Sequence, residues 1–328
     1  MLYPLFLKTN DKITIFAPSA PIPPDKYERF DLSVSNLRAA GFSVRVAEHV
    51  LFDPEKPDGT RGGVVSSPAK ERAKQFSEAL RDGSRAVMAA SGGDMLIEML
   101  EHVDFDEVKR YPKWIEGYSD PTSLLFAVTT KCDIATIYGR NGGGFDSSPI
   151  APHHLMNIEL LKGSIPEYES FSEYYDFEGL TYPTTLSSSC GDFSVSGRLI
   201  GGCLDCLMTV AGTPYDGSEE FCERYKNDGI IWYFDNFAIN CETFFNLLVG
   251  MKYRGLFRHA KAAVFGRVLF PSTHIGMDYK EAAKEVLDLP MLFDADVGHV
   301  APAWPLINGA SAGLSFRDGK AYLKQTLK

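Results

Sequence analysis

Hydrophobic and polar positions in the first half of the chain alternate between two patterns. Short apolar runs such as KITIF and RAVMAAS are typical of buried strands, and the segment PAKERAKQFSEALRDG repeats apolar residues at helical spacing. Gly41 and Gly83 close two predicted helices in the left-handed position that glycine favours, and Ser67 is the predicted N-cap of the second helix. This alternation predicts an α/β fold with a doubly wound, mostly parallel sheet of the flavodoxin-like type.

The rhythm changes in the middle of the chain. Between residues 140 and 195 glycine, proline, serine and tyrosine follow one another without a stable period, apart from a helix candidate at HHLMNIELLKG. Strand and helix patterns then resume and end in a predicted hairpin, GLSFRDGKAYLKQTL. We therefore expect an N-terminal domain over residues 1–150, a linker over 151–192, and a second, mixed α/β domain over 193–328.

Composition narrows the possible partners and location. The 328 residues, 45% hydrophobic and 23% charged, are more than one core usually organises, which agrees with two domains. A net charge of −10 argues against nucleic acid and anionic membranes as partners. No run of roughly 18 apolar residues and no basic leader is present, and six scattered cysteines suit a reducing compartment, so we expect a cytoplasmic protein.

A serine at a strand-to-helix turn is the first candidate for chemistry. In GYSDPT, Ser119 follows an apolar strand and precedes an apolar helix, with Gly117 permitting close approach and Pro121 suited to the first helical turn. Side chains at such turns reach the carboxyl edge of a parallel sheet, where ligands bind. Ser119 is thus either a nucleophile or an ordinary helix N-cap.

A nucleophilic serine needs a base, and the base needs an orienting acid. His299 follows the apolar strand MLFDADVG directly, again at a carboxyl end. Asp235 ends the apolar run IIWYFD, where a carboxylate is costly unless it is paired. Asp294 and Asp296, on the strand of His299 itself, and Glu242, on the next helix, are alternative acids.

Other polar patterns have simpler explanations. His153 and His154 are adjacent but lack a cysteine or carboxylate at ligand spacing, so metal binding is not expected. The CLDC segment lies in an apolar, helix-like run and has no second cysteine pair, which favours packing in a core over a redox or zinc role. The GGD turn after the third strand is by itself weak evidence for phosphate binding.

Taken together, the segments resemble one known family. GYSDPTSLL, ASGGDMLIEML, GRLIGGCLDCL, IIWYFDNF and DADVGHVAPAWPLINGA follow one another as do the landmarks of the LD-carboxypeptidase family of serine peptidases, which also contains microcin immunity peptidases. The resemblance runs from about residue 7 to 315. It implies that Ser119 is the nucleophile, His299 the base and Asp235 the acid.

Two departures from the family pattern bear on activity and substrate. Family members usually carry glutamate and then aspartate at the acid, whereas this chain has Asp235 followed by Asn236; Glu242 is the possible substitute if Asp235 does not reach the histidine. The loop after TIYG usually contains proline, whereas here it reads RNGGGFD. Because that loop bounds the pocket in the family, we expect it to affect the choice of substrate.

The resemblance and the residues together imply acyl transfer to serine. His299 would take the proton of Ser119, and Asp235 would hold the imidazole. The backbone N–H of Asp120 and one from Gly93, or from Gly92, would form the oxyanion hole. No metal and no organic cofactor is required.

The expected function is that of a serine carboxypeptidase that hydrolyses a small peptide amide near a free carboxylate. The favoured reaction is L,D-cleavage of the murein tetrapeptide, which releases D-alanine during peptidoglycan recycling. The alternatives are a microcin-type peptidyl-nucleotide hydrolase, and a peptide- or nucleotide-binding relative that has lost catalysis. Residues 151–200 contain no tryptophan, but Tyr168, Tyr174 and Tyr175 could stack on a base. Family habit also suggests a homodimer.

Overall fold

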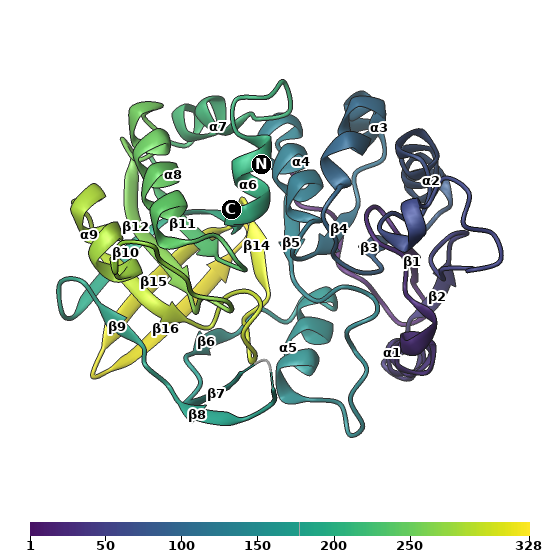
Figure 1. Ribbon diagram of the computed structural model, residues 1–328, viewed down its shortest axis with the longest axis horizontal. Helices are drawn as coiled ribbons and strands as arrows, with labels where there is room; N and C mark the ends of the chain where they lie inside the picture. Colours follow the sequence, from purple (N-terminus) through teal and green to yellow (C-terminus); the bar gives the residue numbers. More distant parts are fainter. Residues whose placement is uncertain (177) are drawn as a thin grey trace. The chain divides into compact units, whose positions relative to one another are not determined.

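The computed structural model describes residues 1–176 and 178–328 and falls into two compact units, Met1–Ser164 and Ile165–Lys328 (Figure 1). Each unit has a sheet with helices packed on it, so the predicted two-domain α/β fold with a largely parallel sheet is confirmed. The helix predicted at HHLMNIELLKG belongs to the first unit as α5, and the short strands β6 to β9 belong to the second.

The first unit contains a parallel sheet in the order β2-β1-β3-β4-β5, which is the flavodoxin-like order. Helices α1 and α5 lie on one face of this sheet and α2, α3 and α4 on the other (Figure 1). Three short 3-10 helices cover Pro24–Lys26, Arg61–Gly63 and Leu96–His102. The strands and α-helices are β1 (Lys12–Phe16), α1 (Tyr27–Ala39), β2 (Ser43–Val46), α2 (Ala69–Arg81), β3 (Ala86–Ala89), α3 (Phe105–Arg110), β4 (Trp114–Gly117), α4 (Thr122–Cys132), β5 (Thr136–Tyr138) and α5 (Pro152–Leu161).

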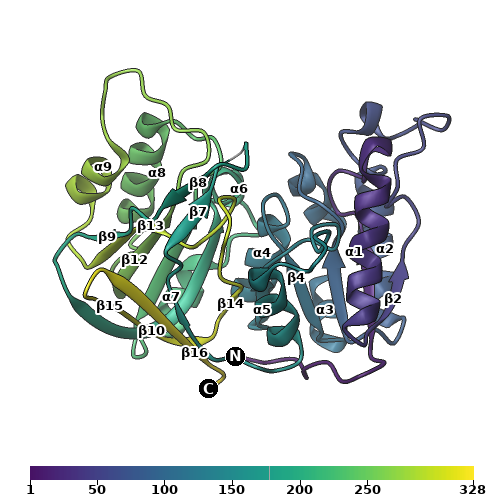
Figure 2. The ribbon, with the colours of Figure 1, turned by 90° about the horizontal axis from the view of Figure 1, so that it is seen from below.

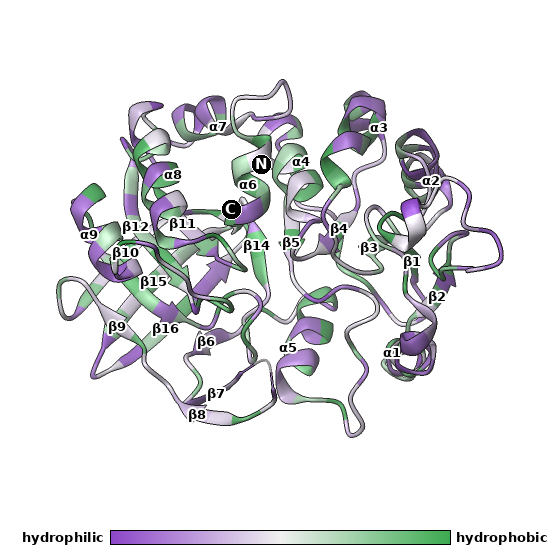
Figure 3. Cartoon of the chain, in the orientation of Figure 1, coloured by the Kyte–Doolittle hydropathy of each residue, from purple (hydrophilic) through white to green (hydrophobic). Residues whose placement is uncertain are grey.

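Burial explains the helical and strand patterns of this unit. Strands β3, β4 and β5 are buried along their whole length, and every residue of α4 except Lys131 is buried. Helix α2 has charged residues on its exposed side and is coloured largely as hydrophilic in Figure 3. A helix buried all round and an amphipathic helix thus cover the same sheet.

Helix ends agree with the sequence at the glycines but not at Ser67. Gly41 and Gly83 have φ angles of 99° and 78°, the left-handed conformation that was predicted. The N-cap of α2, however, is Pro68, and the buried hydroxyl of Ser67 has no hydrogen-bond partner among the residues that the structure describes. The N-cap prediction was wrong because Ser67 lies one residue too far from the helix for its side chain to reach the first free N–H groups.

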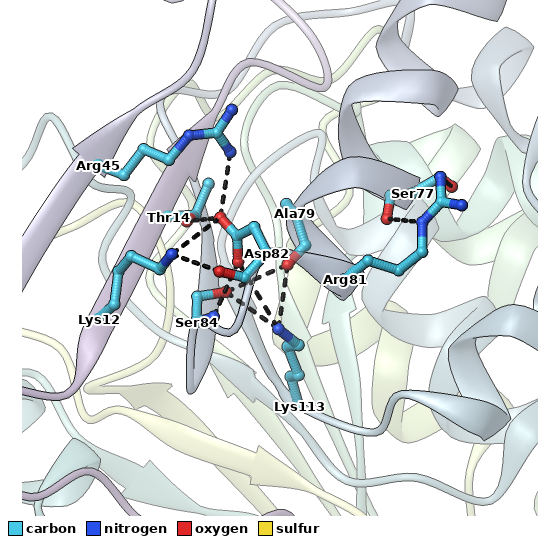
Figure 4. A network of polar contacts seen from close by, with 9 residues as sticks. All are labelled: Lys12, Thr14, Arg45, Ser77, Ala79, Arg81, Asp82, Ser84 and Lys113. Carbon is cyan, nitrogen blue, oxygen red and sulfur yellow. Dashed lines mark hydrogen bonds and ion pairs between the residues drawn. The ribbon is translucent and has the colours of Figure 1, made fainter.

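A partly buried carboxylate, that of Asp82, links residues of β1 and β2 with the residue before β4 (Figure 4). Asp82, just after α2, accepts a hydrogen bond from Thr14 of β1 at 2.6 Å and pairs with Arg45 of β2 at 3.1 Å. Lys12 and Lys113 lie 3.8 Å from its two oxygens. Burial opposes ionisation, but hydrogen bonds from Thr14 and Ser84 and the charge of Lys12 together lower the pKa of Asp82 below its ordinary value.

The second unit contains a mixed sheet in the order β6-β16-β15-β10-β11-β12-β13-β9. Its four central strands, β10 to β13, are parallel, and the flanking strands are antiparallel. Helices α8 and α9 pack side by side against it (Figure 2). The elements are β6 (Glu167–Glu169), β7 (Glu173–Tyr175), β8 (Thr181–Pro183), β9 (Ser187–Ser188), β10 (Phe193–Cys203), α6 (Leu204–Val210), α7 (Ser218–Arg224), β11 (Ile230–Asp235), α8 (Cys241–Tyr253), β12 (Ala260–Gly266), α9 (Tyr279–Val286), β13 (Met291–Ala295), β14 (Leu306–Asn308), β15 (Ser311–Arg317) and β16 (Lys320–Thr326).

Strand β11 is the centre of this sheet and is completely buried. Its Trp232 and Phe234 stack at a centroid distance of 5.8 Å, and Phe234 also stacks on Phe265 of β12 at 5.3 Å. The parallel pairing with β10 ends at Cys203 opposite Asp235. The aromatic core therefore fixes the strand end on which Asp235 lies.

Within the described ranges 1–176 and 178–328, no helix is long and apolar enough to cross a membrane.

Candidate active site

Ser119 lies in a strained turn between β4 and α4. Its φ angle is 69°, a left-handed conformation that costs an L-residue about 1–2 kcal/mol. The backbone N–H of Thr122 donates to its carbonyl oxygen at 2.9 Å, which closes the turn. A residue other than glycine in this conformation is typical of a nucleophile held on a sharp strand-to-helix turn.

The glycine pair of the SGGD turn approaches this serine closely. A Cβ atom on Gly92 would lie 2.9 Å from the Ser119 Oγ and 3.9 Å from the backbone nitrogen of Asp120. Gly93, at a φ of 149°, adjoins the side chain of Ser19 instead, and a Cβ there would overlap it. Gly92 is thus the glycine in contact with Ser119, while the oxyanion-hole roles of Gly93 and Asp120 stay predictions.

The side chain of Asp120 anchors the turn. Its carboxylate accepts hydrogen bonds from the Ser19 hydroxyl and, at 2.8 Å, from the backbone N–H of Leu96. Burial raises the pKa of Asp120 above its ordinary value, and these two hydrogen bonds counteract part of that shift. The turn is therefore tied both to the loop after β1 and to the 3-10 helix after β3.

In the second unit, Asp235 and His299 form a buried pair. The Nδ1 atom of His299 lies 2.7 Å from Oδ2 of Asp235, and the backbone N–H of His299 donates to Oδ1 at 3.2 Å. The side chain of His299 is 9% exposed, and that of Asp235 is 0% exposed. Gly298, at a φ of 93°, lies against the carboxylate so closely that a Cβ would overlap it. The Phe237 ring packs against the imidazole at 4.7 Å.

Glu242, the alternative acid, is placed elsewhere. Its Oε1 atom accepts hydrogen bonds from the Thr273 hydroxyl at 2.8 Å and from the backbone N–H of His274 at 2.6 Å. It therefore caps the loop after β12. The structure brings His299 together with Asp235 and engages Glu242 with that loop.

The other two acidic candidates also have partners of their own. Asp294 pairs with Lys280 at 2.7 Å, and the buried Asp296 pairs with Arg267 at 2.8 Å. Asp296 additionally accepts the backbone N–H of Phe171 at 2.8 Å. Both carboxylates thus serve packing within the second unit.

Cys203 lies beside the His299–Asp235 pair, and the sequence pattern did not predict this neighbour. Its sulfur, a carboxylate oxygen of Asp235 and a ring nitrogen of His299 lie within 4.8 Å of one another. Sulfur, oxygen and nitrogen suit zinc, but an Asp235–His299 separation of 2.7 Å is a hydrogen bond and is shorter than the ~3.3 Å between two ligands of a tetrahedral zinc ion. A hydrogen bond with Cys206 and burial raise the pKa of Cys203 well above its usual range, which keeps the thiol protonated.

The strand register could have revealed this neighbour. Cys203 ends β10 as Asp235 ends β11, and parallel strands bring such ends together. The CLDC segment was instead interpreted as packing in a core, and both of its cysteines are indeed buried. Phe237, which packs on His299, carried no comparable sequence signal.

Each unit has a cavity beside its part of the site. In the first, a cavity of about 300 Å³ is lined by Gly92, Tyr118 and the RNGGG loop. In the second, a cavity of about 430 Å³ is lined by Asn236 and Val300, which neighbour the Asp235–His299 pair in sequence. Its wall includes Tyr174 and Tyr182, stacked at 5.5 Å on the β7–β8 hairpin.

The two units correspond to the two domains of one class of peptidases. Residues 13–139 match the LD-carboxypeptidase N-terminal domain, and residues 196–314 match the LD-carboxypeptidase C-terminal domain. The chain belongs to the LD-carboxypeptidase family, as its sequence segments predicted.

Curated relatives span nearly the whole chain. It is 28% identical to the microcin C7 self-immunity protein MccF of Escherichia coli, over 94% of this chain and 92% of that protein. It is 27% identical to a Vibrio cholerae protein that carries a provisional carboxypeptidase name, over 92% of this chain and 91% of that protein.

Solved structures show the same fold. MccF in complex with aspartyl sulfamoyl adenosine superposes with a TM-score of 0.82 at 23% identity, with both chains covered completely. An MccF-like protein from Bacillus anthracis gives a TM-score of 0.83 at 21% identity over the same coverage.

Proposed function

We propose that this protein is a serine carboxypeptidase in which Ser119 of the first unit acts with His299 and Asp235 of the second. The hydrogen-bonded Asp235–His299 pair is the observation that carries the proposal, because a buried acid on Nδ1 leaves Nε2 of the imidazole as the basic atom. The strained conformation of Ser119 and the family membership support it.

In the proposed reaction, Nε2 of His299 accepts the Ser119 proton as the oxygen attacks the amide carbonyl. The imidazolium then gives this proton to the departing amine, and water repeats the sequence to release the acyl group. Asp235 holds the tautomer and stabilises the imidazolium. The N–H groups of Asp120 and Gly93 would stabilise the oxyanion, each contributing roughly 3–4 kcal/mol to the transition state.

The proposed substrate is the murein tetrapeptide, cleaved between its L- and D-configured residues with release of D-alanine. Several curated relatives have carboxypeptidase names, and one from Bacillus subtilis, 26% identical, is named a probable murein peptide carboxypeptidase. The proposed role in peptidoglycan recycling, a cytoplasmic location and a homodimer are predictions from the sequence.

A second candidate function is hydrolysis of a peptidyl nucleotide. The observation that favours it is the stacked pair Tyr174 and Tyr182 in the wall of the larger cavity, with the Arg267 guanidinium 4.6 Å from the Tyr174 ring. Aromatic faces of this kind suit a nucleobase. Relatives support it too, since MccF has been solved with aspartyl sulfamoyl adenosine and with adenosine monophosphate.

Incubation with the two substrate classes tests these proposals. We expect wild-type protein to release D-alanine from the murein tetrapeptide, and Ser119→Ala to reduce the rate at least 1,000-fold, because loss of the nucleophile leaves only binding and the oxyanion hole. The readout is D-alanine measured by chromatography. Undiminished release by Ser119→Ala would overturn the mechanism, and cleavage of a peptidyl adenylate analogue without tetrapeptide cleavage would favour the second function.

A further inference from the structure

Arg140 and Ser119 follow two neighbouring strands at the carboxyl edge of the first sheet. Strands β4 and β5 are parallel neighbours, with Gly117 opposite Tyr138. Ser119 and Arg140 each follow two residues beyond that pair. Adjacent strands are about 4.8 Å apart. Both residues therefore follow neighbouring strands, and the Arg140 guanidinium lies 5.9 Å from the ring of Tyr118, which precedes the serine.

The loop that carries Arg140 is fastened to the serine turn. The backbone N–H of Tyr118 donates to the Asn141 side-chain oxygen at 3.1 Å, and the Asn141 amide donates back to the Tyr118 carbonyl at 3.3 Å. Gly143 donates to the carbonyl of Ala90 at 3.0 Å, where a Cβ would crowd that oxygen. The glycine run thus lets the loop lie against the end of β3, beside the SGGD turn.

The backbone of Arg140 is held from the other side by α5. Its N–H donates to the Asn157 side-chain oxygen at 2.7 Å, and the Asn157 amide donates to the buried Glu116. Burial raises the pKa of Glu116 to about 8, so this carboxyl is neutral at pH 7 and adds no negative charge near the arginine.

The guanidinium of Arg140 is oriented by neutral imidazoles. Its Nε donates to Nε2 of His154 at 2.9 Å, and its Nη2 lies 3.4 Å from Nε2 of His153. Burial, and then the charge of Arg140, lower the pKa of His153 to about 4 and that of His154 to about 2. Among the described residues, 1–176 and 178–328, no carboxylate forms an ion pair with Arg140. The cation is thus positioned but not neutralised.

The cavity that Arg140 lines has an excess of positive charge. The cavity has a volume of about 300 Å³. Among the described residues, the charged ones in its wall are three cations, Lys26, Arg29 and Arg140, and one carboxylate, Asp146. Asp146 already pairs with Arg29 at 2.6 Å. In a protein with a net charge of −10, this wall is locally positive, and it includes Gly92, the glycine that lies against Ser119.

We propose that Arg140 binds the free terminal carboxylate of the peptide substrate. This inference rests on the proposed carboxypeptidase function, in which that carboxylate is the anionic group nearest the scissile amide. A guanidinium presents a planar fork that matches a carboxylate with two parallel hydrogen bonds. The RNGGG sequence, where the family usually has proline, thereby acts as the segment that selects peptides with a free carboxyl end.

The kinetic test compares one substrate in two forms, the murein tetrapeptide and the same tetrapeptide with its terminal carboxylate amidated. We expect Arg140→Gln to lower kcat/KM for the free acid roughly 10- to 100-fold, the usual effect of losing a charge-assisted hydrogen bond, and to change kcat/KM for the amide less than about 3-fold. Arg140→Lys should recover part of the loss. Arg38→Gln, an equal change of charge on the exposed surface of α1, is the matched control and should change neither.

Binding without turnover separates this proposal from the proposed function. By titration calorimetry, we expect the tetrapeptide to bind Ser119→Ala protein at least about 10-fold more tightly than Ser119→Ala/Arg140→Gln protein. This result would support the inference even if wild type cleaves neither substrate, which would overturn only the peptidase function.

The proposal is overturned by any of three results. Arg140→Gln could lower cleavage of acid and amide equally, which would show a general effect on the site. It could lower neither although wild-type protein cleaves the free acid. The two Ser119→Ala proteins could bind the tetrapeptide with equal affinity or not at all.

Discussion

His299 is held at two points by a single carboxylate, one contact to its ring and one to its backbone. Asp235 is fully buried, and its second oxygen is tied to the backbone of the histidine, so the shorter aspartate still reaches the imidazole. The family's usual glutamate would need more space at the place where Gly298 already adjoins the carboxylate.

At this scale the two acidic candidates give opposite expectations. Asp235→Asn should lower kcat roughly 1,000- to 10,000-fold, because an amide stabilises the wrong tautomer of His299 and leaves the imidazolium unpaired. Glu242→Gln should lower kcat less than about 3-fold, since Glu242 contacts the loop after β12. Steady-state kinetics on the tetrapeptide measures both.

The reverse order of effects would restore Glu242 as the orienting acid. Equal, small effects would favour the third hypothesis, a binding protein that has lost catalysis. In that case tetrapeptide affinity would also be insensitive to Asp235→Asn.

At the scale of elements, the close pairing of β10 with β11 positions Asp235 and Cys203. Gly201 of β10 adjoins the carbonyl oxygen of Tyr233 of β11, and a Cβ at Gly201 would overlap that oxygen. The backbone N–H of Gly201 donates to the side-chain oxygen Oδ1 of Asn308 at 3.2 Å, and the Tyr233 hydroxyl donates to that same Oδ1 at 2.8 Å. The two strands thus leave no room for a side chain at this position.

We expect Gly201→Ala to reduce the free energy of unfolding by about 3 kcal/mol or more, or to prevent folding, because the strands must separate to admit the methyl group. Gly313→Ala, in β15 of the same sheet, should change it by less than about 1 kcal/mol, since a Cβ there meets no atom within 4 Å. Urea unfolding followed by circular dichroism measures both. Equal effects of the two substitutions would contradict the packing described.

The strands and most helices could be predicted from hydrophobic periodicity because each sheet is buried on both faces or on one face. Structural details that depend on a single hydrogen bond could not be predicted from this periodicity. Ser67 looked like a helix cap, yet α2 begins beyond its reach. The segment DMLIEML has apolar residues at helical spacing, yet Leu96–His102 form a 3-10 helix, which apolar spacing does not distinguish from an α-helix over so short a segment.

The candidate site was predictable where a residue ends a strand and less so where strands must be paired first. Ser119, Asp235 and His299 follow strands along the chain and were identified from that position. Cys203 and Arg140 are neighbours of the site through register, as β10 pairs with β11 and β5 with β4. The sequence indicates where the strands are, but it does not indicate which strands are adjacent in a sheet.

For the whole molecule, the proposed chemistry divides between two units that each organise their own share. The first holds the strained serine, the glycines beside it and a positively charged cavity. The second holds the paired acid and base. Catalysis as proposed therefore requires that groups from both units act on one bond.

Covalent labelling of Ser119 by a small fluorophosphonate, located by peptide mass spectrometry, tests this requirement most directly. We expect wild-type protein to be labelled at Ser119, and His299→Gln to slow labelling at least about 100-fold, because the serine loses its general base. Labelling of Ser119 at an undiminished rate in His299→Gln, or labelling of a different residue, would contradict it.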